Sequence, residues 1–283
     1  MAKIKWSDEK VVERIKQGYG SGSGMDYKPW IHVVNGPTSK SFAQRPKGWK
    51  TNRKHQLLSI LEFHTFLFFE WEEAVIDIRE QYPLNRTKTE VIAEKLGIKH
   101  PNFDRRNTKD KQQVLSVMTT DFLLSVKNND EIGYIAIAVK PSEELDKKRT
   151  IEKLEIEKTY WEEKNIKWGI FTEKDLNDNF INNLKFIHNH KGPLPQFERK
   201  YFDNLSAKLV KGIHENSDQV FQYFFDNFDG TFNLEEGTAI SLFRYCLANK
   251  FIMTDMLKPI DFSSKIKDLI VANEGNKKEG VLV

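Results

Sequence analysis

The sequence predicts an α/β domain with a mixed sheet flanked by helices, followed by a mainly helical, winged-helix-like domain. Three observations support this. The hydrophobic periodicity alternates between helix and strand as far as residue 175. The composition then changes to a segment rich in Asn with Gly-Pro and Pro breaks. The chain has 283 residues, which is enough for two domains of ordinary size. The predicted parts are an N-terminal arm (1–24), an α/β domain (25–175), a helical DNA- or partner-binding domain (176–275) and a loose tail (276–283).

The first domain is predicted from apolar spacing and from helix or strand breakers. Leu58, Leu61, Thr65 and Phe68 follow a helical repeat, and an alternating segment that stops at Pro83 follows them. The expected order is helix, strand, helix, strand, strand, helix and strand, which fits a mixed sheet with helices on its faces. The ranges are 55–73, 74–84, 87–96, 114–126, 133–141, 143–164 and 168–172.

The remaining segments are predicted in less detail. Residues 1–24 contain a short amphipathic stretch followed by GYGSGSG, which is typical of a flexible hinge. Residues 175–202 are expected to include a linker or interdomain loops, and the HNH letters at 188–190 are interpreted as a loop without metal ligands. Three helices (201–215, 218–228 and 234–250) and a short strand (250–257) are compatible with a winged-helix module.

The charge distribution is more informative than its total. The formal net charge of +3 is too small for a protein that simply coats DNA. However, the stretch from Pro37 to Gln56 holds six bases and no acid, and Trp30 and Trp49 bracket it. Such a stretch can contact a phosphate backbone, although charge alone favours a solvated loop. The six bases are Lys40, Arg45, Lys47, Lys50, Arg53 and Lys54.

Cysteine usage and hydropathy limit the compartment. The single cysteine, Cys246, excludes an intrachain disulfide and a Cys-rich zinc site. The N-terminus lacks the apolar core of a signal peptide, and no apolar run approaches the ~18 residues of a membrane span. We therefore expect an intracellular protein without a membrane segment.

Three residues suggest chemistry. Asp121 lies in the middle of an apolar strand, Lys140 ends the next strand, and Glu62 lies on the apolar face of the first helix. A buried carboxylate is costly unless it is paired or binds a metal. A hairpin would bring Asp121 and Lys140 together, and the set suits phosphodiester hydrolysis with Mg²⁺ held by Asp121, Glu62 and the Val139 carbonyl. Lys140 would orient or deprotonate the attacking water, or stabilise charge on the phosphate. Each residue alone is more often half of a structural ion pair.

The order of these residues resembles the restriction-endonuclease-like nucleases, and the wording resembles the TnsA family more closely still. TnsA is the 5′-end endonuclease subunit of heteromeric TnsA/TnsB transposases. The resemblance covers about residues 10–175 and is weaker in the second domain. It is carried by RIKQGYGSGSGMDYKPW, HQLLSILEF, VIDIREQYPL, GIKHP, VMTTDFLLSV, AVKP and RTIEKLEIEKTYWEEKNIKWGIFTEK.

The resemblance implies a restriction-endonuclease-like fold and a Mg²⁺- or Mn²⁺-dependent endonuclease in the bacterial cytoplasm. It implies that Glu62, Asp121 and Lys140 are catalytic. It also implies double-stranded DNA at transposon ends, a TnsB-like transposase that reads the ends, and a TnsC-like ATPase regulator docked on the C-terminal domain. This chain would then need only backbone contacts to DNA, from 37–56 and from the loop 99–111 with Arg105 and Arg106.

One position departs from the family's pattern. The residue two before the lysine is Glu, Asp or Gln in the wider motif, and here it is Ala138, native or introduced. A methyl group cannot coordinate a metal, so we expect Ala138 to impair metal binding unless Glu62 and Val139 complete the site. Two rival hypotheses remain: a non-catalytic adaptor between TnsB-like and TnsC-like partners, and a stand-alone restriction or repair nuclease.

Overall fold

The computed structural model describes residues 5–32, 43–129 and 131–271. It divides into two compact units, Met1–Leu176 and Asn177–Val283. Each unit has its own hydrophobic core, and each is described by itself below.

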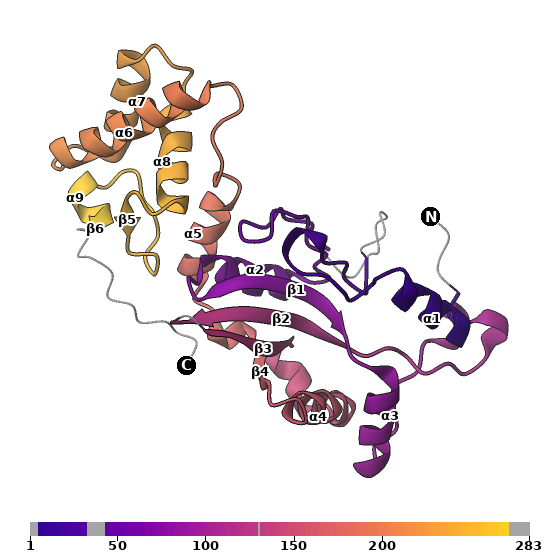
Figure 1. Ribbon diagram of the computed structural model, residues 1–283. Coiled ribbons are helices and arrows are strands. Elements are labelled where there is room, and N and C mark those ends of the chain that lie inside the picture. The colour runs from indigo at the N-terminus through magenta and orange to yellow at the C-terminus, as the bar shows by residue number, and fades with distance from the viewer. Residues whose placement is uncertain (1–4, 33–42, 130, 272–283) are drawn as a thin grey trace. The chain divides into compact units, whose positions relative to one another are not determined.

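The first unit is built on a four-stranded mixed sheet in the order β1-β2-β3-β4 (Figure 1). The first three strands pair antiparallel, and the last pairs in parallel with β3. A parallel pair needs a crossover, and the helix α4 between β3 and β4 supplies it. The mixed sheet predicted from the sequence is confirmed. The strands are β1 (Val75–Pro83), β2 (Thr119–Asn128), β3 (Glu131–Val139) and β4 (Lys167–Phe171).

Helices cover both faces of this sheet (Figure 1). Phe122 of β2 packs edge-on against Phe69 on one face, with 5.5 Å between ring centroids. Its neighbour Leu123 lies in a core with Ile156 and Trp161 on the other face, because consecutive strand residues point to opposite faces. The helices are α2 (Ile60–Trp71), which holds Phe69, α3 (Arg86–Lys95) and α4 (Lys148–Glu162), which holds Ile156 and Trp161.

The N-terminal segment packs against the same unit. Helix α1 (Asp8–Lys16) buries Val11 in a cluster with Trp30 and Val117. The glycine-rich segment predicted as a flexible hinge lies against the end of β1. Gly20 has a φ of +83°, and a Cβ there would overlap the ring of Pro83, so only glycine fits this approach.

The second unit is mainly helical with a two-stranded antiparallel sheet. Its core holds Phe221, Phe225, Phe243 and Phe262, whose rings lie 5.0 to 6.1 Å apart. The elements are α5 (Asp178–His188), α6 (Arg199–Glu215), α7 (Phe221–Thr231), α8 (Thr238–Ala248), β5 (Met253–Thr254), α9 (Ile266–Leu269) and β6 (Ile270–Val271).

Two expectations for this unit need correction. The segment predicted as linker or loops contains helix α5, whose Ile181, Leu184 and Ile187 are buried at helical spacing among the Asn residues. His188, predicted in a loop, is therefore the last residue of α5 and is buried. The tail 276–283 lies outside the described residues. No helix in the described part of the chain is long and apolar enough to cross a membrane.

Candidate active site

Asp121 lies where β2 and β3 separate. The last pair of the β2–β3 ladder joins Phe122 to Ile137, although both strands continue beyond it. The Asp121 carboxylate enters at this point and accepts a hydrogen bond of 2.7 Å from the backbone N–H of Val139. A charged acceptor thus replaces the backbone partner of an ordinary ladder, which gives the carboxylate a defined position.

Lys140 forms an ion pair with Asp121. Its ammonium donates a hydrogen bond of 2.6 Å to Oδ2 of Asp121 and one of 2.8 Å to the carbonyl oxygen of Val139. The Lys140 backbone N–H donates to the carbonyl of Phe171 on β4, so the residue is fixed just after the end of β3. The structure therefore brings Asp121 and Lys140 together, as a hairpin predicts. The Lys140 ammonium therefore contacts both oxygen atoms that we expect to bind a metal, one from the Asp121 carboxylate and one from the Val139 carbonyl.

Glu62 faces this site from the first turn of α2. Ser59 caps the helix and accepts from the Glu62 N–H at 3.0 Å. Oε2 of Glu62 accepts from the Leu58 N–H at 2.9 Å and from the side-chain amide of Gln81 at 3.1 Å. Burial and the neighbouring charge of Asp121 raise the pKa of Glu62 to about 7.

Glu157 is a third acid that the sequence reasoning missed. It lies on α4 and is 5% exposed. Its carboxylate accepts a hydrogen bond of 3.2 Å from the indole N–H of Trp168. Burial and the charge of Asp121 raise its pKa to about 7. The signal was available, because Leu154, Tyr160 and Trp161 place Glu157 on the buried stripe of the helix at i, i+3 and i+4 spacing.

Lys140 is surrounded by these acids. Burial alone would lower the pKa of its ammonium, but Asp121, Glu157 and Glu62 outweigh burial and raise it. Lys140 is therefore protonated at neutral pH. In the described part of the chain, no group of three or more His, Cys, Asp and Glu side chains is arranged to hold a metal by itself. A metal would need the Val139 carbonyl, and water or a DNA phosphate, besides the carboxylates.

Ala138 occupies the position that carries Glu, Asp or Gln in the wider motif. It is fully buried and pairs with Ile170 on β4. The Ala138 methyl group has no oxygen, so this side chain cannot bind a metal.

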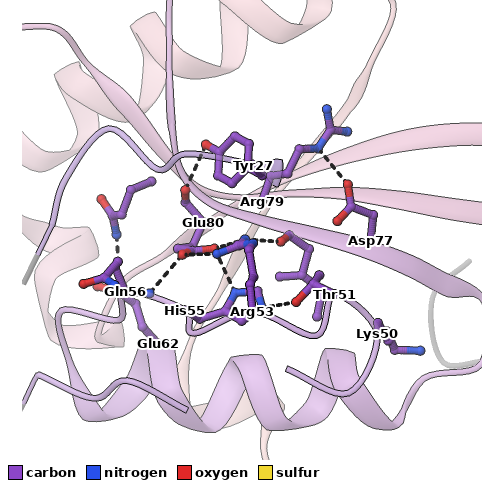
Figure 2. A network of polar contacts seen from close by, with 12 residues as sticks. Tyr27, Lys50, Thr51, Arg53, His55, Gln56, Glu62, Asp77, Arg79 and Glu80 are labelled. Carbon is purple, nitrogen blue, oxygen red and sulfur yellow. Dashed lines mark hydrogen bonds and ion pairs between the residues drawn. The ribbon is translucent and has the colours of Figure 1, made fainter. Parts of the chain in front are cut away.

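A second acidic network centres on Glu80 and lies near Glu62 (Figure 2). Oε1 of Glu80 accepts from the Arg53 guanidinium at 2.8 Å and from the Gln56 backbone N–H at 2.9 Å. His55 Nδ1 lies 2.8 Å from Oε2 of Glu80, and Thr51 lies 2.7 Å from the other ring nitrogen. Burial alone would raise the pKa of Glu80, but the hydrogen bonds and charges of Arg53 and His55 outweigh it and lower the pKa to about 2.

This network changes the interpretation of the basic stretch. Arg53, predicted to contact DNA, is 9% exposed and bound to Glu80. The ammonium of Lys50 donates 2.7 Å to the carbonyl of Glu72. Spacing along a loop does not show which bases turn inward. Lys40 lies outside the described residues, whereas Arg45, Lys47, Lys54, Arg105 and Arg106 are exposed.

Comparisons with known proteins show the family of the chain. A model described as TnsA-like endonuclease N terminal matches residues 72–173, and one described as TnsA endonuclease C terminal matches residues 175–256. The chain is also 36% identical over 278 residues to the transposon Tn7 transposition protein TnsA of Escherichia coli, covering 98% of this chain and 97% of that protein. The chain belongs to the TnsA family. The TnsA-like N-terminal match contains Asp121, Lys140 and Glu157, whereas Glu62 precedes it. The TnsA C-terminal match ends near Thr254 of β5, inside the second unit.

Proposed function

We propose that this chain is the metal-dependent endonuclease that cuts the 5′ strand at each transposon end, together with a TnsB-like transposase. The convergence of the Asp121 carboxylate and the Val139 carbonyl on one positive charge, beside Glu62, carries the proposal. Oxygen ligands of this kind suit Mg²⁺ or Mn²⁺. We further propose that the protein works in the cytoplasm.

The residues divide the work as follows. Asp121, Glu62 and the Val139 carbonyl would hold the metal, which would polarise the phosphate and activate a bound water. Lys140 is protonated, so its ammonium suits the orientation of that water and the stabilisation of charge on the phosphate better than proton abstraction. Asp121 holds Lys140 and the Val139 N–H together, which keeps these groups in register.

DNA contacts are assigned to exposed bases of the first unit, and DNA or protein contacts to the helical second unit. Arg45, Lys47, Lys54, Arg105 and Arg106 are exposed and would contact phosphates. The helical domain predicted over residues 176–275 would bind DNA or a TnsC-like ATPase. Sequence recognition would then fall to the TnsB-like partner.

Ala138 supports a second candidate function, a catalytically weakened adaptor that bridges TnsB-like and TnsC-like partners. The buried methyl group removes one possible metal ligand. In this alternative the chain would support assembly and the partner's 3′ cut without cutting the 5′ strand itself.

Strand-specific cleavage of labelled transposon-end DNA separates the two candidates. The assay contains Mg²⁺ or Mn²⁺ and the TnsB- and TnsC-like partners, with this chain, Asp121→Ala and Ala138→Gln. We expect 5′ cleavage that Asp121→Ala abolishes and Ala138→Gln increases. Absence of 5′ cleavage by all three, with the 3′ cut intact, would establish the adaptor. If Ala138→Gln leaves both the cleavage rate and the metal affinity at the parent values, the expected effect of Ala138 is disproved.

A further inference from the structure

Gln81 has an unusual backbone conformation for a residue inside a strand. Its φ is +49°, in the left-handed region that residues other than glycine avoid, and the residue is 1% exposed. Such strain costs on the order of 1–3 kcal/mol and persists where the surrounding structure requires it.

The left-handed residue reverses the alternation of β1. Consecutive residues of a strand normally point to opposite faces. Here Glu80 contacts His55 and Gln81 contacts Glu62, on the side of α2, while the Tyr82 ring lies 5.8 Å from Trp161 of α4. The backbone conformation therefore places two adjacent polar side chains on one side of the sheet.

The position of Gln81 joins three parts of the candidate site. Glu80 pairs with Phe122 and Tyr82 with Thr120, so Gln81 lies level with Asp121 in the sheet. Its amide donates 3.1 Å to Oε2 of Glu62, and its amide oxygen accepts from the Thr119 hydroxyl at 3.4 Å. The Gln81 carbonyl accepts from the Trp30 N–H at 3.2 Å, which holds the strained peptide in place.

We infer that Gln81 is a positioning residue that holds the Glu62 carboxylate in place for the metal that Asp121 also binds. The inference rests on the proposed function. The amide is a neutral donor, so it orients Oε2 of Glu62 without adding a charge that would repel a cation. Outer partners of metal-binding carboxylates commonly fix ligand orientation in this way. With Ala138 apolar, the site depends more strongly on the placement of Glu62.

Gln81→Gly separates this role from a structural one. Glycine adopts the same backbone without strain, so the variant removes the amide while relieving the backbone. Asn165→Gly is the matched control, because Asn165 is exposed in the turn between α4 and β4 and also has a positive φ, +55°. Both variants are compared with the parent and with Asp121→Ala in the full chain.

Four quantities are measured: Mn²⁺ affinity by paramagnetic resonance, the midpoint of thermal unfolding without metal, and kcat and KM for 5′ cleavage in the presence of the partners. We expect Gln81→Gly to lower Mn²⁺ affinity about tenfold and kcat by a similar factor. The DNA KM should stay at the parent value. The midpoint reports two opposed changes, relief of the strained backbone and loss of a buried side chain. Asn165→Gly should change neither the Mn²⁺ affinity nor kcat.

Two results would overturn the inference. An unchanged Mn²⁺ affinity in Gln81→Gly would show that the amide does not position a ligand. An equal loss of Mn²⁺ affinity in Asn165→Gly would show that the backbone change, and not the loss of the amide, weakens metal binding. If Asp121→Ala binds Mn²⁺ as tightly as the parent, the proposed metal site itself is wrong, and the inference about Gln81 fails with it.

Discussion

Two acidic networks lie beside each other in the first unit, and their electrostatics are opposite. Glu80 is buried, but its carboxylate is hydrogen-bonded to Arg53, to His55 and to a backbone N–H. These contacts lower its pKa to about 2. Glu62 and Glu157 are also buried, but they share Lys140 with Asp121, and both have a pKa raised to about 7.

The difference shows that burial alone does not decide what an acid does. A buried carboxylate with full hydrogen bonding and a guanidinium is a structural link, and here it fastens the basic loop to β1. Three carboxylates around one ammonium have an excess of negative charge, which a divalent cation would neutralise. Strongly perturbed acids of this kind are typical of functional sites.

The largest expected effect comes from removing Arg53 from the network around Glu80. Arg53→Met leaves Glu80 buried with its main cationic partner removed, so we expect a loss of about 3–5 kcal/mol in the free energy of unfolding. Urea denaturation measures this loss. Arg106→Met is the control, since its exposed ion pair with Asp104 should leave the urea midpoint unchanged. Equal midpoints for the two variants would contradict the structural role of Glu80.

Removing an acid from the network around Lys140 should have the opposite effect. The folded pKa of Glu157, about 7, exceeds its ordinary value of 4.5, so the folded state loses stability as pH rises from about 4.5 through 7. Glu157→Gln should therefore stabilise the protein at pH 8 by up to about 3 kcal/mol and have little effect below pH 4.5. Urea denaturation at the two pH values tests this. A gain that does not depend on pH would rule out relief of the ionised carboxylate.

A bound cation should also offset the excess negative charge around Lys140. At a Mg²⁺ or Mn²⁺ concentration of 100 times Kd, we expect stabilisation of about 2.7 kcal/mol. It should be reversed by chelation and absent in Asp121→Ala. Thermal unfolding with metal and with EDTA measures the effect, and equal stabilisation of parent and Asp121→Ala would place the metal elsewhere.

The smallest expected effect concerns the bases that the Glu80 network leaves exposed. Lys47→Ala with Lys54→Ala should weaken DNA binding and reduce the slope of log K against log salt by about 2, since each phosphate contact contributes about 0.9. Lys164→Ala with Lys167→Ala, also exposed, is the control pair. Binding titrations at several salt concentrations decide, and equal slopes for both pairs would remove the basic loop from the DNA interface.

Features that depend on neighbours along the chain could be predicted without the structure. Alternation and turn residues predicted the β2–β3 hairpin, and the hairpin was sufficient to bring Asp121 and Lys140 together. The misplaced acid in an apolar helix likewise marked Glu62. Residues 175–202 were predicted less well, because their Asn content obscured the helical spacing of α5.

Contacts between groups far apart in the sequence could be found only in the folded structure. Arg53 and Glu80 are 27 residues apart, and only their packing turns a predicted DNA contact into a buried link. Glu157 gains its raised pKa from Asp121, which lies on another element. Gln81 reaches Glu62 because one strained peptide reverses the alternation of β1. Periodicity assigns a residue to a face, but the pairing of charges and amides depends on how the faces meet.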